Sequence, residues 1–179
     1  MKKIILIILI FVLVSIPCFA EFETDTNGFV QIFADSERVV FAPEHQLLSP
    51  LNTNLFYNKG VVSIQLTIVP KTKNNLNNLH KVAQKFFTAQ TDPGALKEIK
   101  GSVWDVEFIK DFKQMNIFKV SFIDVNGWPV VKGRFGESMD LTDKGNWLFA
   151  VVLKKLDAYY LKIKTESKPH ERNLENVEV

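Results

Sequence analysis

Cysteine is almost absent from this chain of 179 residues: the single one is Cys18. It lies within the first twenty residues, which have the pattern of a cleavable leader. A mature chain that begins after Ala20 has no thiol, so it forms no disulfide and offers no cysteine nucleophile. Such a domain depends on its apolar core, and a chain of about 159 residues is long enough to bury a sizeable one.

A concentrated excess of basic residues is also missing. The full chain has 22 lysines and arginines against 20 aspartates and glutamates. Cleavage removes Lys2 and Lys3, which leaves 20 residues of each sign and a formally neutral mature chain. Nucleic-acid binding needs a clustered basic footprint, so the sequence argues against a nucleic-acid partner.

Sequence signatures of metal sites and of catalysis are missing too. The three histidines are His45, His80 and His170, and none has a second histidine or a carboxylate at a spacing such as HExxH. We expect surface or packing roles for them, because a zinc site needs three or four converging ligands. Neither GxSxG nor SxxK occurs. The sequence therefore predicts no metal site, no cofactor and no catalytic residue.

One polar stretch, 136–146, contains oxygen ligands that could face one another around Ca²⁺. These are Asp140, Asp143 and Asn146. Their spacing does not match the EF-hand loop. Aspartate and asparagine favour turns and caps, and we expect those roles here, in a polar loop.

An export signal is present at the start of the chain. A basic start precedes the thirteen-residue apolar run Ile4–Ile16, which is short for a membrane-spanning helix. Small residues at Cys18 and Ala20 suit cleavage after Ala20. We expect an exported protein, periplasmic or extracellular after cleavage, that contacts the membrane only if the leader is retained. Pro17 disfavours lipidation of Cys18, because a small residue is needed before such a cysteine.

The stretch Val103–Phe135 is predicted to form three antiparallel strands, and the other elements of the chain are placed around it. Asn126-Gly127 predicts a type I′ turn, and its two-residue loop places Val125 opposite Trp128. The predicted pairs of this hairpin are Phe122 with Val131, Val120 with Gly133, and Phe118 with Phe135. The preceding hairpin, with the loop Phe112-Lys113-Gln114, pairs Trp104 with Phe122, Val106 with Val120, and Phe108 with Phe118.

These pairs place apolar side chains on one face and opposite charges on the other. The charged rows are Glu107–Lys119–Arg134 and Asp105–Ser121–Lys132. Each cross-strand ion pair contributes about 0.2–1 kcal/mol. A buried Trp or Phe contributes about 1.5–3 kcal/mol, so the apolar face decides the register. Gly133, opposite Val120, leaves a gap in that face, which admits an aromatic side chain from the helix or a ligand.

Hydrophobic periodicity predicts the other elements of a single α+β domain over residues 21–164, followed by a polar, disordered tail over 165–179. We expect a mostly antiparallel sheet of about seven strands with one main helix packed on one face. The elements are strands Phe29–Phe33, Arg38–Ala42 and Val62–Ile68, a long loop Pro43–Lys59, a helix capped by Asn74 or Asn75 that extends to Gln90, and strands Trp147–Leu153 and Tyr159–Ile163.

This order of elements resembles the PsbP/Mog1-like family over roughly residues 29–164. The shared features are a short strand pair, a long strand, a helix and then four or five strands in succession. The predicted strand and tail at the end of this chain stand where the family would have a terminal helix. The resemblance implies a small noncatalytic binding or assembly module.

Trp128 and Arg134 are the candidate binding residues. Trp128 flanks the turn on the polar face, and an exposed aromatic beside a hairpin tip is a candidate contact residue. The alternative for Trp128 is that it covers Ile123 or packs under a loop. Arg134 belongs to the same polar face. We expect an exported noncatalytic domain that binds a protein or an envelope component. The alternatives are a carrier of a small apolar ligand, held between the helix Leu76–Gln90 and the sheet, and a hydrolase with an unrecognised site.

Overall fold

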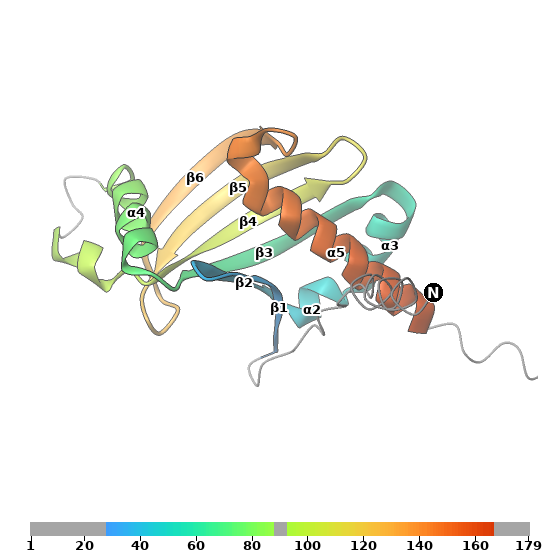
Figure 1. The fold of residues 1–179 in the computed structure, drawn as a ribbon, viewed down its shortest axis with the longest axis horizontal. Helices are drawn as coiled ribbons and strands as arrows, with labels where there is room; N and C mark the ends of the chain where they lie inside the picture. Colours follow the sequence, from blue (N-terminus) through green and yellow to red (C-terminus); the bar gives the residue numbers. More distant parts are fainter. Residues whose placement is uncertain (1–27, 88–92, 167–179) are drawn as a thin grey trace, which may run out of the picture.

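The computed structural model describes residues 28–87 and 93–166, without the side chains of Pro93, Arg134 and Phe135. One antiparallel sheet of six strands follows the order of the sequence, with helices on one of its faces (Figure 1). The α+β class and the mostly antiparallel sheet are confirmed. The strands are β1 (Phe29–Ala34), β2 (Arg38–Pro43), β3 (Val61–Pro70), β4 (Gly101–Ile109), β5 (Gln114–Ile123) and β6 (Pro129–Asp140). The α-helices are α2 (Glu44–Leu47), α3 (Pro50–Lys59), α4 (Lys73–Gln84) and α5 (Trp147–Glu166), and the short 3₁₀ helices are η1 (Pro93–Glu98) and η2 (Lys144–Asn146).

The predicted strands Trp147–Leu153 and Tyr159–Ile163 are wrong. The structure has a single 20-residue helix, α5, over both segments, and it ends at Glu166, two residues beyond the expected domain boundary. A run that is apolar at every position fits a covered strand and a buried helix equally well. The buried residues of α5 recur at helical steps of three and four: Leu148, Phe149, Val152, Leu153, Leu156, Tyr159 and Tyr160.

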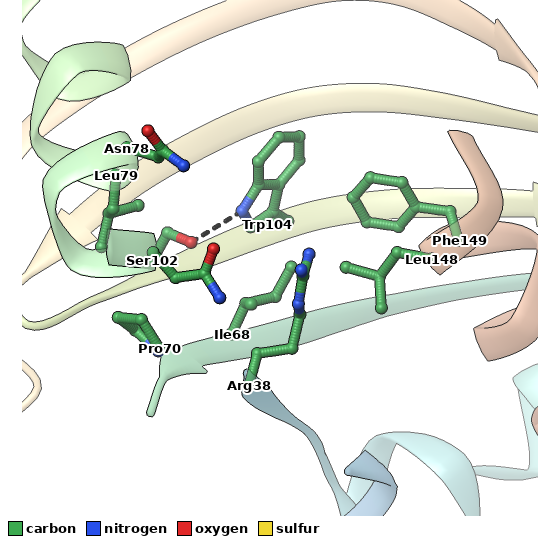
Figure 2. A pocket seen from close by; sticks show the side chains of 10 residues that line it. Arg38, Ile68, Pro70, Asn78, Leu79, Ser102, Trp104, Leu148 and Phe149 are labelled. Atoms are coloured by element: carbon green, nitrogen blue, oxygen red, sulfur yellow. Dashed lines mark hydrogen bonds between the residues drawn. The ribbon is translucent and has the colours of Figure 1, made fainter. Parts of the chain in front are cut away.

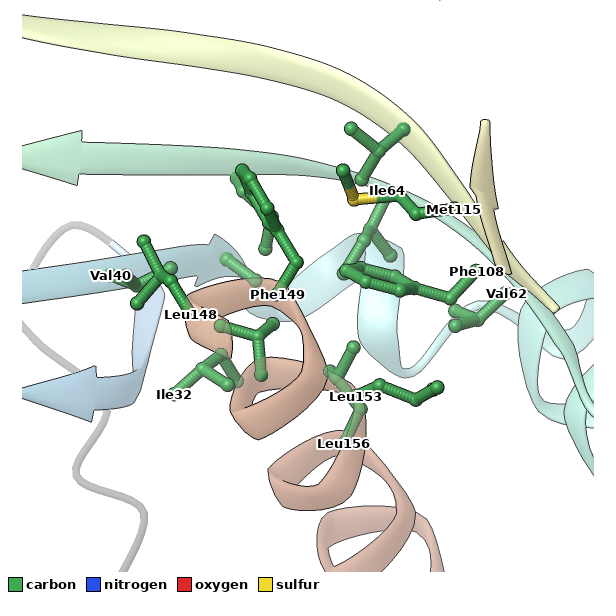
Figure 3. Close-up of a cluster of buried hydrophobic side chains, with 14 of the residues drawn as sticks. Ile32, Val40, Val62, Ile64, Phe108, Met115, Leu148, Phe149, Leu153 and Leu156 are labelled. Carbon is green, nitrogen blue, oxygen red and sulfur yellow. The ribbon is translucent and has the colours of Figure 1, made fainter. Parts of the chain in front are cut away.

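The main helix of the fold is therefore α5 rather than the helix expected near Leu76. It crosses the sheet diagonally (Figure 1). Figure 3 shows its side chains packed against strands from both halves of the sheet. The residues that meet there are Leu148, Phe149, Leu153 and Leu156 of α5 with Ile32, Val40, Val62, Ile64, Phe108 and Met115 of the sheet.

The predicted long loop Pro43–Lys59 is also wrong, because it contains α2 and α3. Ser49 caps α3 by accepting a hydrogen bond from the Asn52 N–H, and Pro50 occupies the first turn. Gly60, with φ of 63°, ends the helix in the left-handed conformation. The signals of a helix were present in the sequence, but the prolines and asparagines favoured a loop.

Helices α2 and α3 cover the part of the β3 edge that β2 leaves open. Strand β2 pairs with β3 only between Thr67 and Pro70. Beyond that point, the Asn52 amide accepts from the Ser63 N–H (3.3 Å) and donates to the Ser63 carbonyl (2.8 Å). Gln46 Oε1 accepts from the Gln65 N–H at 2.7 Å. Side chains therefore replace a neighbouring strand and satisfy an edge that would otherwise be open to association.

The register of the β5–β6 hairpin is confirmed for Phe122 with Val131 and for Val120 with Gly133. The type I′ turn is wrong. Gly127 has φ of 83°. Its N–H donates to the Asp124 carbonyl, and the Asp124 N–H donates to the Trp128 carbonyl. Asn126 is not among the described residues with positive φ. The tip is thus a type I turn followed by a left-handed glycine, and a shift between Phe122 and Ile123 absorbs the extra residue.

The β4–β5 register is displaced from the prediction by two residues at Trp104 and by three residues from Val106 to Phe108. Trp104 faces Val120 rather than Phe122, and Phe108 faces Met115 rather than Phe118. Two features cause this: the connection is the four-residue loop 110–113, and the register shifts again between Asp105 and Val106.

Phe118 consequently lies outside the core and is 52% exposed. The predicted Phe118–Phe135 pair is absent from the ladder. The charged row also changes, because Lys119 faces Asp105, with Nζ to Oδ2 at 4.0 Å, in place of Glu107.

Helix α4 begins earlier than predicted, since Thr72 rather than Asn74 or Asn75 is its cap and accepts from the Asn75 N–H. The expected gap at Gly133 is filled as predicted by an aromatic side chain. Phe86, just beyond the end of α4, lies so close that a Cβ on Gly133 would be 2.7 Å from its Cδ1. The Phe86 ring also packs on Phe122, with centroids 5.7 Å apart.

Candidate functional site

A pocket of about 360 Å³ lies on the helical face of the sheet, between α4 and the first turn of α5. We call it the α4–α5 pocket. Figure 2 shows side chains from three strands and both helices converging on it. The residues that define it here are Arg38, Ile68, Asn78, Ser102, Trp104 and Phe149.

The floor of the pocket comes from neighbouring positions on β3 and β4. Ile68 and Ser102 are cross-strand partners, and Trp104 lies two residues further along β4, on the same face. The Trp104 Nε1–H donates to Ser102 Oγ at 2.9 Å, which fixes the indole over the sheet (Figure 2). Phe149 packs against the same indole, with centroids 5.3 Å apart and planes at 52°. The floor is therefore aromatic and aliphatic, with one buried hydroxyl.

Arg38 supplies the charged group of the pocket. Its guanidinium contacts the carboxylates of Asp35 (Nε to Oδ2, 3.8 Å) and Glu37, and it lies 5.4 Å from the centre of the Trp147 ring. Its Nε is nevertheless buried without a hydrogen-bond partner among the described residues. A buried donor without an acceptor is uncommon, so this atom points to a missing partner.

The rim of the pocket is polar because α4 turns two asparagines toward it. Asn75 Nδ2 donates to the Glu37 carbonyl at 3.2 Å, which joins α4 to the turn before β2. Asn78 is exposed at the mouth. Amides both donate and accept, so the mouth can bond a polar group of either kind. An apolar floor with a few converging polar groups suits the binding of a small molecule.

Trp128, the first candidate binding residue, lies at the tip of the β5–β6 hairpin and is 71% exposed. Val125, at the same tip, is 79% exposed. Asp124 Oδ1 accepts from the backbone N–H groups of Asn126 and Trp128, each at 2.8 Å. The segment Asp124–Trp128, which we call the hairpin tip, thus presents two apolar side chains on a braced loop.

Arg134, the second candidate, faces Lys119 in the β5–β6 ladder. Its side chain lies outside the described residues, and a role in binding stays a prediction. The sequence placed both candidates on the polar face of the hairpin. The backbone places them at different points of β6, with Trp128 before its first residue and Arg134 near its middle.

The turn roles expected for Asp140, Asp143 and Asn146 are confirmed. Asp140 accepts from the Thr142 hydroxyl and N–H, and these hydrogen bonds lower its pKa. Asp143 Oδ1 accepts a capping hydrogen bond from the Gly145 N–H, and the Asn146 amide donates to the Asp140 carbonyl. The polar loop is shorter than predicted, because β6 continues to Asp140. No group of three or more potential metal ligands occurs among the described residues.

The histidines are placed as packing or surface residues where the structure describes them. His80 Nε2 lies 3.0 Å from the Ile99 carbonyl, so the ring ties α4 to the segment before β4. His45 belongs to α2, and His170 is outside the described residues. Sequence reasoning missed Arg38 and Ser102. One signal was available, since Ser102 is the polar member of the otherwise apolar series Ser102, Trp104, Val106 and Phe108.

No family model, no curated protein and no solved structure matches this chain. The resemblance to the PsbP/Mog1-like family therefore stays a prediction. None of the described helices is both long enough and apolar enough to span a membrane.

Proposed function

We propose that this protein is an exported, noncatalytic binding domain whose hairpin tip docks on a protein of the cell envelope. The observation that carries the proposal is the exposure of Val125 and Trp128, 79% and 71%, within one four-residue stretch. Tryptophan is enriched among the residues that dominate binding energy at protein interfaces. Burying such a side chain in a partner contributes about 1.5–3 kcal/mol.

The bracing of the tip supports the same proposal. Binding costs free energy when a flexible loop must be ordered. The two hydrogen bonds to Asp124 Oδ1 and the backbone bond from the Asp124 N–H to the Trp128 carbonyl already order this loop in the free protein. Little of the free energy gained by burying Trp128 in an apolar pocket of the partner would therefore be offset by ordering the loop.

The experiment is capture of partners from an envelope extract by the purified protein, compared between wild type and Trp128→Ala. Phe112→Ala is the matched control, because Phe112 is 74% exposed and lies in the loop at the opposite end of β5. We expect a defined partner that Trp128→Ala loses and Phe112→Ala keeps. Identical sets of captured proteins for wild type and Trp128→Ala would contradict the proposal.

Export is the part of the proposal that rests on sequence. The leader pattern before Ala20 lies outside the described residues. The hydrolase alternative has weaker support, because the hydroxyls that donate to carboxylates, Thr142 to Asp140 and Ser63 to Glu107, are exposed and lie outside the α4–α5 pocket.

A further inference from the structure

We propose that the α4–α5 pocket is a second binding site, separate from the hairpin tip, for an uncharged amphipathic molecule. The molecule would have a planar ring and one acceptor oxygen, such as a carbonyl. Neither the residues nor the surface of this site belongs to the tip, so the inference does not depend on the proposed protein partner.

The ring is inferred from the shape and lining of the pocket. A volume of about 360 Å³ is within the range of small-molecule sites. The indole of Trp104 and the ring of Phe149 are inclined at 52° and line one side, and Ile68 and Leu148 are the aliphatic lining (Figure 2). Aromatic surfaces favour offset or edge contacts with a planar guest.

The acceptor oxygen is inferred from two donors. Arg38 Nε is buried and lacks a hydrogen-bond partner among the described residues. Ser102 Oγ accepts the indole N–H, so that bond leaves the hydroxyl proton unused. Both residues line the pocket, and Figure 2 shows the Arg38 guanidinium directed into it, toward Trp104 and Phe149. A carbonyl or ether oxygen placed there would satisfy a buried donor.

The absence of charge is inferred from the neighbours of Arg38. The carboxylates of Asp35 and Glu37 both contact its guanidinium, so its positive charge is already compensated. Arg38 is the one charged residue among those that line the pocket. A carboxylate or phosphate on the ligand would therefore be buried there without an unpaired cation. A cationic group would meet the guanidinium itself. A neutral acceptor avoids both costs.

The test uses Prodan, a neutral naphthalene ketone whose emission depends on polarity, and its dimethylaminonaphthoate analogue, in which a carboxylate replaces the ketone. We expect saturable binding of one Prodan with a blue shift of its emission. The naphthoate should bind at least about tenfold more weakly, because its charge would be buried beside a guanidinium that Asp35 and Glu37 already compensate. Naphthoate binding as tight as that of Prodan, or no saturable Prodan binding, would overturn the proposal.

Two neighbouring substitutions locate the bound probe. Asn77 and Asn78 are adjacent, exposed residues of α4, and only Asn78 lines the pocket. We expect Asn78→Trp to obstruct the mouth and weaken Prodan binding by at least about tenfold, and Asn77→Trp to leave it unchanged. Arg38→Met keeps the apolar stem, removes the donor and should also weaken Prodan binding. Equal effects of the two asparagine variants would place the probe elsewhere and refute the site.

Discussion

At the scale of single residues, the absence of a side chain at Gly133 decides where α4 meets the sheet. Val120, the cross-strand partner of Gly133, is fully buried, and Gly133 leaves space that the ring of Phe86 occupies. The gap was visible in the sequence from the hairpin register alone. Only the structure shows that Phe86 is the residue that enters it.

We predict that Gly133→Ala lowers the free energy of unfolding by about 1–3 kcal/mol, because the new Cβ would be 2.7 Å from Phe86 Cδ1 and the ring must move. Urea denaturation measures the change.

Gly136→Ala is the matched control in the same strand. A Cβ there meets nothing within 4 Å, so we expect a change within about 0.5 kcal/mol. Equal destabilisation by the two variants would contradict the packing argument.

At the scale of secondary-structure elements, Tyr160 joins α5 to α2 and α3. Its hydroxyl donates to the Leu47 carbonyl at 3.0 Å, and its ring stacks on Phe56 with centroids 4.3 Å apart. The Tyr57 hydroxyl in turn donates to the Tyr160 carbonyl at 2.7 Å. Burial, with smaller contributions from Tyr159 and Tyr57, raises the pKa of Tyr160 well above that of a free tyrosine.

This shift predicts a loss of stability in alkaline solution. Tyr160 stays neutral in the folded protein at pH values where the unfolded chain, with a tyrosine pKa of about 10, already releases its proton. The contribution of Tyr160 is therefore complete below about pH 10 and is lost as the pH rises further. We expect the free energy of unfolding, measured by urea titration from pH 8 upward, to fall above about pH 10.

Tyr160→Phe isolates the contribution of this hydroxyl. It should lower the free energy of unfolding by about 0.5–1.5 kcal/mol at neutral pH and flatten the alkaline slope. Tyr57→Phe should change the slope less, because Tyr57 is 38% exposed. An alkaline slope that is the same in wild type and Tyr160→Phe would show that the Tyr160 hydroxyl does not cause it.

At the scale of the whole molecule, the lack of cysteine after residue 20 makes packing the source of stability. A domain without disulfides has to be stable through packing, and the described residues do bury one continuous apolar cluster that spans all six strands and α5. The leader pattern predicts where the mature chain begins.

We predict that the protein recovered after expression in a bacterium starts at Glu21, as read by mass spectrometry of its N-terminal peptide. Ala20→Arg should block processing and retain the leader, because the cleavage site needs a small residue there. Recovery of wild-type protein that starts at Met1 from the exported fraction would contradict cleavage.

Local patterns predicted the parts of the fold that depend on neighbours in the sequence. Alternation placed β1, β2 and β3, and Asn126-Gly127 with its flanking residues gave the inner pairs of β5 and β6. The β4–β5 register failed by two to three residues, because the loop length and the shift at Asp105–Val106 respond to packing of the whole face. The sequence placed Trp128 beside the turn but left open whether it is exposed or covered, and the structure shows it 71% exposed.

The α4–α5 pocket could not be predicted in detail because its lining comes from distant parts of the chain. Arg38, Ile68, Ser102 and Phe149 belong to four different elements, and their side chains converge only after the sheet and α5 have assembled. The expected space between the helix and the sheet is where the pocket lies. Its second wall, α5, was predicted as strand, so neither its shape nor its polar groups followed from the sequence.

The sequence by itself determined that residues 21–179 have no thiol and equal numbers of basic and acidic residues. It also determined the alternation that makes β3, β5 and β6 strands. Tertiary structure decided that Trp147–Glu166 is a helix. An apolar run satisfies the period of a strand and of a helix alike, so the surface on which it packs selects between them. That selection also created the pocket, since the first turn of α5 brings Leu148 and Phe149 over Trp104 and Ile68.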